Sequence, residues 1–284
     1  AMRSIVAIDR LSDRMITESV YSWGPDSSAM KRPFILERAG LYLLHLTKQG
    51  NSQMAYLDTV SGQVVAEASP EVRADFIRRA YNHTIGGIVG FAVVEWFLFS
   101  SGMAMPMAEV MLSGSWLLVL GAFILVSWIA TRVAHTVESV PMQYLAFAGL
   151  VVAEAIIFVP LLAIAMMTAP GIIESAAWVT LMGSAALVVI AHVTGKDFSF
   201  LRGLMMWGGL LALIAIVSAV IFGFHLGTWF SVAMIGFAGA AVLYDTSNIL
   251  HHYPQDRHVA AGMALFASIA LMFWYVLRLF IARD

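Results

Sequence analysis

The sequence contains no cysteine and little charge. Without cysteine, the chain cannot form a disulfide, an iron–sulfur centre or a thiolate nucleophile. Only 12% of its 284 residues are charged, whereas a soluble domain carries roughly 25%, so the composition argues against a water-soluble globule. The formal net charge of −2 gives no electrostatic basis for binding nucleic acid.

Signatures of catalysis are missing as well. The sequence has no His-Glu-x-x-His zinc motif, no Gly-x-Ser-x-Gly nucleophile elbow and no phosphate-binding loop. The cluster His251, His252, Asp256 and His258 matches no standard zinc spacing. We therefore expect no enzymatic activity, no cofactor and no resident metal.

Apolar residues dominate, at 60% of the chain, and the charges are unevenly placed. Residues 1–80 hold 10 of the 16 Lys and Arg residues and 9 of the 18 Asp and Glu residues. This distribution predicts two parts, a polar N-terminal extension over residues 1–75 and a membrane-embedded domain over residues 76–284.

Long apolar runs define the membrane domain. A transmembrane helix needs about 20 mostly apolar residues to cross roughly 30 Å of hydrocarbon. Seven windows meet this requirement: 84–104, 115–134, 142–168, 172–194, 202–223, 228–250 and 259–281. The runs are continuous rather than alternating, which favours helices over barrel strands. The sequence thus predicts an all-α, polytopic protein whose first partner is the lipid bilayer.

The positions of lysine and arginine predict the orientation. Lysine or arginine residues lie before the first window, at the end of the second, between the fourth and fifth windows, and between the sixth and seventh. The connections after the first, third and fifth windows contain none. Cytoplasmic loops carry an excess of these residues, so we expect a cytoplasmic N-terminus. A seventh crossing would place the C-terminus outside, where Arg278 and Arg283 conflict with this rule. The alternative is a last helix that re-enters the membrane and returns to the cytoplasmic side; we favour a full span.

Three carboxylates lie inside the predicted spans. Glu95, Glu154 and Asp245 each carry an insertion cost of about 2.5–3.5 kcal/mol when charged at mid-bilayer. Such residues line an ion or proton path, or they act as neutral acids that hydrogen-bond between helices. The two interpretations are evenly balanced for Glu95 and Glu154.

Asp245 has the strongest functional context. Helical spacing places Asp245, Asn248 and His252 on one face, where oxygen and imidazole groups bind a hard cation or relay a proton. The alternative is that His252 reaches the interface and Asn248 caps the helix end. Arg132 closes the second window on the same side, which predicts an Asp245–Arg132 ion pair acting as a latch that protonation opens.

Two local patterns predict how helices pack and begin. Gly86 and Gly90 form a Gly-x-x-x-Gly face suited to close helix packing. Asp197 or Ser199 is expected to cap the helix that starts near residue 202.

Three stretches carry a family resemblance. They are Arg73-Ala-Asp-Phe-Ile-Arg-Arg-Ala-Tyr81, Thr194-Gly-Lys-Asp-Phe-Ser199, and Leu243-Tyr-Asp-Thr-Ser-Asn-Ile249 followed by a last helix ending Val276-Leu-Arg-Leu-Phe280. Together they resemble the Bax inhibitor-1 (transmembrane BAX inhibitor motif) family over residues 67 to 284. The resemblance implies a seven-helix bundle with a central last helix and, for a bacterial-type member, a location in the inner membrane.

The resemblance also implies function. It implies a pH-sensitive Ca²⁺ leak or cation/proton exchange, and a link in bacterial members to the FtsH membrane protease. The family's cation site is a pair of aspartates, of which Asp245 matches the first, whereas Ser268 occupies the second position. A serine hydroxyl cannot share a proton as a second carboxylate does. Glu154 or Glu95 supplies the missing charge if its helix packs against the helix of Asp245.

Two functions remain open at this point. The first is a pH-sensitive Ca²⁺ leak channel or cation/proton exchanger centred on Asp245. The second is a non-conducting regulator that binds other membrane proteins, such as an FtsH-type protease complex. The resemblance does not extend over the first 50-odd residues, which suggests the hypothesis that the native chain starts at Met54.

Overall fold

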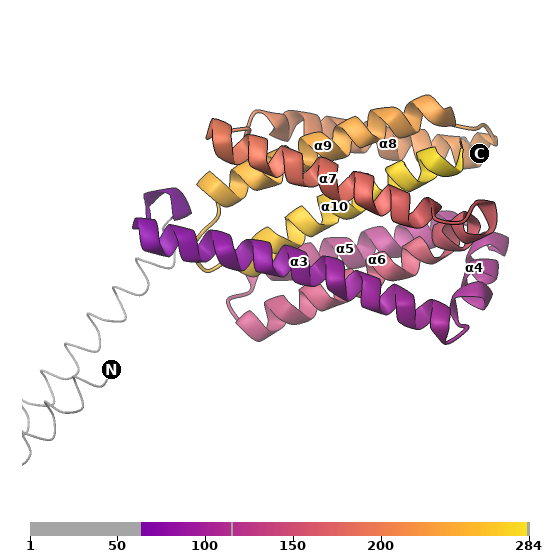
Figure 1. Ribbon diagram of the computed structural model, residues 1–284, viewed down its shortest axis with the longest axis horizontal. Coiled ribbons are helices and arrows are strands. Elements are labelled where there is room, and N and C mark those ends of the chain that lie inside the picture. The colour runs from indigo at the N-terminus through magenta and orange to yellow at the C-terminus, as the bar shows by residue number, and fades with distance from the viewer. Residues whose placement is uncertain (1–63, 115, 283–284) are drawn as a thin grey trace, which may run out of the picture. The chain divides into compact units, whose positions relative to one another are not determined.

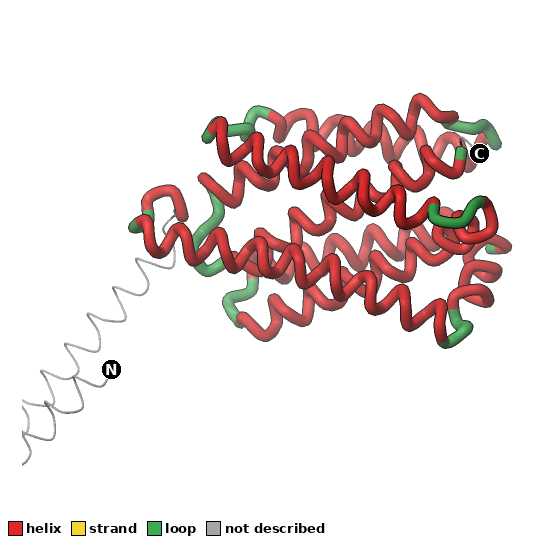
Figure 2. The backbone as a smooth tube through the Cα atoms, in the orientation of Figure 1, coloured by secondary structure: helices red, strands yellow, loops and turns green. Residues whose placement is uncertain are grey.

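The computed structural model describes residues 64–114 and 116–282. The predictions for residues 1–63, including a start at Met54, lie outside this part of the chain. A 3₁₀ turn, η1 (Val65–Glu67), precedes the helices α3 (Pro70–Ser100), α4 (Ala104–Ser113), α5 (Trp116–Thr136), α6 (Val140–Thr168), α7 (Ile172–Thr194), α8 (Leu201–Phe222), α9 (Gly227–His251) and α10 (His258–Ile281). Figures 1 and 2 show that the long helices lie side by side along one direction.

The predicted fold class is confirmed. Seven of the helices are long and apolar enough to cross a membrane, namely α3 and α5 to α10. The expected spans match these helices to within a few residues at almost every boundary. The short helix α4 was not predicted, because its 10 residues fall below the length that a span requires.

The largest difference lies at the start of α3. The expected window begins at residue 84, but the helix begins at Pro70, where Ser69 is the N-cap and accepts a hydrogen bond from the Val72 amide at 3.5 Å. Proline is favoured at a first helical position because its missing N–H is unpaired there in any case. Asp75 then pairs with Arg78 and Arg79 on the exposed surface. The helix therefore continues through a charged segment that hydropathy alone places outside the membrane.

Helix α10 occupies the centre of the bundle, as expected. It packs against α3, α5, α6, α7 and α9, and residues on all sides of it are buried. It is one continuous helix from His258 to Ile281, which agrees with a full span. Helix α8 has no buried residue and packs on α9, so it lies at the periphery.

Close packing of α3 on α10 depends on glycines other than the predicted pair. The Gly86/Gly90 prediction is wrong at Gly86, where an added Cβ atom would have no neighbour within 4 Å. At Gly87, the same atom would lie 2.7 Å from Cζ of Phe147 and 2.9 Å from Cδ2 of Phe266. At Gly262 on α10, it would lie 2.5 Å from the carbonyl oxygen of Ala80. A Gly-x-x-x-Gly pattern identifies small residues but not the side of the helix that meets a neighbour.

Four segments meet at one end of the bundle. The Val65 amide donates to the carbonyl oxygen of Tyr253 at 2.9 Å, and Arg257 donates to the carbonyl oxygen of Val137 at 2.5 Å. These bonds join η1 and the α5–α6 loop to the α9–α10 turn. The α7–α8 loop reaches the same place through Asp197 and His252. These four segments therefore share one end of the bundle, as the alternation of lysine and arginine along the sequence predicts.

Candidate functional site: a polar pocket beside Asp245

Asp245 is held by a contact between two central helices. The Ser268 hydroxyl on α10 donates a hydrogen bond to Oδ2 of Asp245 on α9, with 2.5 Å between the oxygens. Ser268 is only 9% exposed, whereas Asp245 is partly buried. The serine that the sequence places at the family's second aspartate position therefore does contact the first.

Asp245 also lines an open pocket of about 630 Å³. Its lining residues are His135, Tyr244, Asp245, Asn248, His252, Tyr253, Pro254, Asp256, Arg257 and Ala264. Asp245, Asn248 and His252 thus share a face, as their spacing predicts. His135, Tyr253, Asp256 and Arg257 were missed, because α5 and the α9–α10 turn bring them to this face from other parts of the chain.

The predicted ion pair between Asp245 and Arg132 is wrong. Arg132 is exposed, and no ion pair joins it to Asp245 in residues 64–114 and 116–282. His135, about one turn further along α5, faces the pocket instead. The guanidinium that shares the pocket with Asp245 is that of Arg257, which pairs with Asp256 at 3.2 Å and donates to Val137.

Tyr253 forms part of the pocket wall as a neutral phenol. Burial raises the pKa of Tyr253, and the nearby Asp245 carboxylate raises it further. The Tyr253 hydroxyl hydrogen-bonds with Nε2 of His135 at 3.3 Å. This contact connects α5 to the α9–α10 turn within the wall of the pocket.

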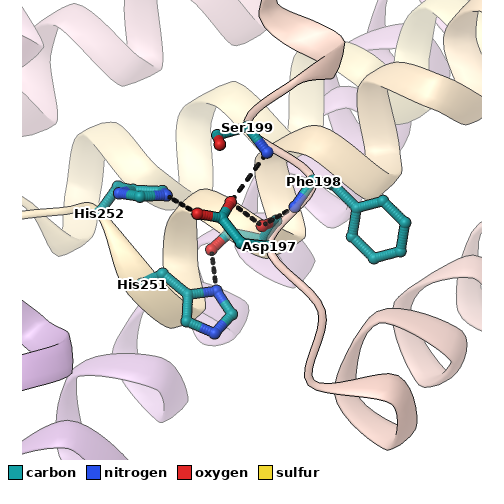
Figure 3. A network of polar contacts seen from close by, with 6 residues as sticks. Asp197, Phe198, Ser199, His251 and His252 are labelled. Carbon is teal, nitrogen blue, oxygen red and sulfur yellow. Dashed lines mark hydrogen bonds and ion pairs between the residues drawn. The ribbon is translucent and has the colours of Figure 1, made fainter.

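Asp197 organises a polar network next to the pocket (Figure 3). Its Oδ2 bonds to Nε2 of His252 at 3.0 Å, and its Oδ1 accepts from the Ser199 amide at 2.8 Å. The Ser247 hydroxyl donates to Oδ1 at 3.3 Å and accepts from the Phe198 amide at 2.8 Å. The prediction that Asp197 or Ser199 caps α8 is wrong, since Phe200 is the N-cap and makes no side-chain capping bond.

This network fixes a loop against the end of α9. Gly195 ends α7 with a φ of 57°, a left-handed backbone conformation that residues other than glycine rarely adopt. The turn directs Asp197 toward His252. The hydrogen bond from His252, followed by that from the Ser199 amide, lowers the pKa of Asp197 to about 2.

Replacing Asp197 with asparagine is expected to lower the thermal midpoint of unfolding slightly at neutral pH. Exposed pairs of this kind contribute about 0.2–1 kcal/mol. Because the folded state depresses the pKa of Asp197 from 3.8 to about 2, its carboxylate stabilises the fold above pH 3.8 and loses that effect as the pH falls to about 2. The difference between the variant and the parent protein should therefore shrink across this acidic window.

Thermal unfolding in detergent across the pH range checks this prediction. Glu138→Gln is the control, because it removes an exposed carboxylate from the α5–α6 loop. A deficit in Asp197→Asn that persists unchanged at pH 2 would show that the carboxylate is not the stabilising form.

The other two membrane carboxylates lie elsewhere. Glu95 and Glu154 are both buried, and neither lines the pocket of Asp245. Glu95 lines a cavity with Phe91 and Phe273, and Glu154 lines another with Arg278. The prediction that one of them supplies the missing charge next to Asp245 is therefore wrong. Within the described part of the chain, no three His, Cys, Asp or Glu side chains are grouped to hold a metal.

Comparison with known proteins identifies the family of this chain. The profile of the family described as "Inhibitor of apoptosis-promoting Bax1" matches residues 73–284, which cover α10 entirely and α3 almost entirely. The chain belongs to this family. The match includes the Asp245 region, the Asp197 loop and the central last helix, so the Bax1-inhibitor family assignment covers the whole described pocket.

Individual relatives match shorter segments. The chain is 33% identical over 113 residues to the Modulator of FtsH protease YccA of Escherichia coli K12, covering 36% of this chain and 50% of that protein. It is equally similar to the Inner membrane protein YccA of E. coli O6:H1. It is 33% identical over 95 residues to the BI1-like protein of Arabidopsis thaliana, covering 32% of this chain and 36% of that protein. These alignments thus span half or less of each relative.

Proposed function

We propose that this Bax1-inhibitor family protein passes a cation, Ca²⁺ or H⁺, under pH control, with Asp245 as its binding group. The observation that carries the proposal is the position of Asp245, which lies in an open polar pocket and is fixed by Ser268 at 2.5 Å. Carboxylate and amide oxygens, such as those of Asp245 and Asn248, are suitable ligands for a hard cation. The asymmetry of lysine and arginine along the sequence supports a cytoplasmic position for this end of the bundle.

Ser268 defines the charge of this pocket. A hydroxyl donates one hydrogen bond to Asp245 and leaves its charge unshared, whereas a second carboxylate would hold a proton in common with it. Arg257 is already bonded to Asp256 and Val137, so it does not neutralise Asp245. Asp245 is thus able to take a cation from the aqueous side.

The absence of an Arg132 pair in the described residues reverses the expected effect of acid. A latch would open when protons neutralise Asp245. A carboxylate that binds Ca²⁺, in contrast, loses its negative charge on protonation and releases the ion. Passage of Ca²⁺ should therefore decrease at acidic pH.

A cysteine introduced at Asn248 tests the proposal, because the 284-residue chain has no cysteine of its own to react. We expect a charged, membrane-impermeant thiol reagent to stop Ca²⁺ or H⁺ flux through Asn248→Cys protein in liposomes. Leu118→Cys, at an exposed apolar position on α5, is the control and should keep its flux. Flux that continues after complete labelling at position 248 would contradict passage through this pocket.

A second candidate is a non-conducting regulator of other membrane proteins. The observation in its favour is the similarity to the Modulator of FtsH protease YccA. A chain with this function would bind a membrane protease complex and need no ion path. Failure of the parent protein to conduct any cation in the liposome experiment favours this function over the first.

A further inference from the structure

A second cavity, separate from the pocket of Asp245, lies between α3 and α7 and against α6 and α10. Its volume is about 380 Å³, within the range of about 300–1,000 Å³ typical of small-molecule sites. Its walls are almost entirely apolar and include the rings of Phe91, Phe266 and Phe273. A cavity of this size and lining suits a hydrophobic molecule.

One group in this cavity has no structural explanation. Glu95 is 7% exposed, and both of its carboxylate oxygens lack a hydrogen-bond partner within residues 64–114 and 116–282. Thr180 also lines the cavity, but its hydroxyl donates to the carbonyl oxygen of Ala176 at 2.8 Å. Burying a carboxyl without a partner is costly, and burying a carboxylate without a cation is far more so. The described side chains therefore supply neither a hydrogen-bond donor nor a cation to Glu95.

The cavity opens toward the lipid. Helices α3 and α7 both pack on α10 (Figure 1), and the lining residues Ala92 and Leu181, one from each helix, are exposed. Glu95 lies well inside the apolar part of α3, more than one turn from its C-terminal end at Ser100. An opening at this depth faces hydrocarbon, so a ligand must first dissolve in the bilayer.

We propose that this cavity binds a lipophilic primary amine. The ammonium group would pair with the Glu95 carboxylate and supply the missing donors, while the apolar body of the ligand fills the space between the phenylalanine rings. An ammonium ion is also attracted to the faces of aromatic rings within about 6 Å of their centres. A neutral alcohol of the same shape offers one hydrogen bond and no charge, and a fatty acid adds a second negative group. The inference does not depend on cation passage at Asp245.

Saturable binding of radiolabelled 4-phenylbutylamine to the full chain in lipid nanodiscs tests the proposal. Protein-free nanodiscs measure the partitioning of the amine into lipid, which is subtracted. We expect one amine per chain, and an affinity at least about tenfold weaker for Glu95→Gln, because a hydrogen bond to a charged group is lost. Unlabelled 4-phenyl-1-butanol should compete at least about tenfold less well than the unlabelled amine, for the same reason.

Two further variants separate recognition from folding. Ala177→Phe fills the cavity from α7 and should abolish saturable binding while Glu95 remains. Glu154→Gln alters a buried acid in a different cavity and should bind as the parent does. Unchanged binding in Glu95→Gln, equal competition by the alcohol, or only the partitioning seen with empty nanodiscs would each overturn the proposal. Folding should not confuse the result, because Glu95→Gln removes an unpaired acid rather than an existing bond.

Discussion

Replacing Gly262 with alanine is expected to destabilise the bundle by about 3 kcal/mol, the upper end of the usual cost of overpacking a core. The added methyl group would lie 2.5 Å from the Ala80 carbonyl oxygen and 3.2 Å from the Thr84 amide nitrogen, both backbone atoms of α3. A rotamer change does not relieve contacts with backbone, so α3 and α10 must separate. The separation also breaks the hydrogen bond from the Thr84 hydroxyl to the Gly262 carbonyl, which is 3.1 Å long.

Thermal unfolding in detergent measures this effect. A loss of about 3 kcal/mol corresponds to a decrease of roughly 6–12 °C in the midpoint for a chain of this size class. Gly86→Ala is the matched control, since the added methyl group meets nothing within 4 Å and alanine is the better helix former. We expect that variant to unfold at or slightly above the midpoint of the parent. Equal midpoints for the two variants would show that α3 and α10 do not pack at Gly262.

The sequence predicts the helices of this protein well because the bilayer imposes a simple rule. A span needs a continuous apolar run of fixed length, and such runs are visible without tertiary information. The windows 172–194 and 202–223 accordingly match α7 and α8 within one residue at each end. The charged start of α3 was missed because helix formation there depends on capping at Ser69 and on ion pairs, which hydropathy does not measure.

The pocket was predictable only along a single helix. Helical periodicity places Asp245, Asn248 and His252 on one face without reference to any other element. Which residue of α5 meets that face depends on the rotation of α5 in the bundle. The sequence therefore suggested Arg132, whereas the structure places His135 there.

The same limitation explains Asp197 and the buried glutamates. Asp197 lies 55 positions before its partner His252, and the turn at Gly195 that brings them together is not evident from spacing. Glu95 and Glu154 face different cavities, which are lined by different residues of α10. Only the assembled bundle determines which of the three acids lie close to one another.

Replacing Asp245 with asparagine is expected to reduce cation flux at neutral pH by at least about tenfold, the factor that corresponds to losing one charged ligand contact. Asparagine retains the shape of the side chain and an oxygen that accepts the hydrogen bond from Ser268. The variant should therefore fold normally, and the loss of flux reports the missing negative charge. Because protonation produces the same neutral state, acid should reduce the flux of the parent but have little further effect on the variant.

The initial rate of Ca²⁺ entry into liposomes containing equal amounts of parent and Asp245→Asn protein tests the central claim most directly. Glu174→Gln, which alters an exposed acid in the first turn of α7, provides the control and should conduct at the parental rate. The account predicts that Asp245→Asn conducts at a tenth of that rate or less, and that acid no longer changes it. A parental rate in Asp245→Asn, with its response to acid intact, would contradict the account.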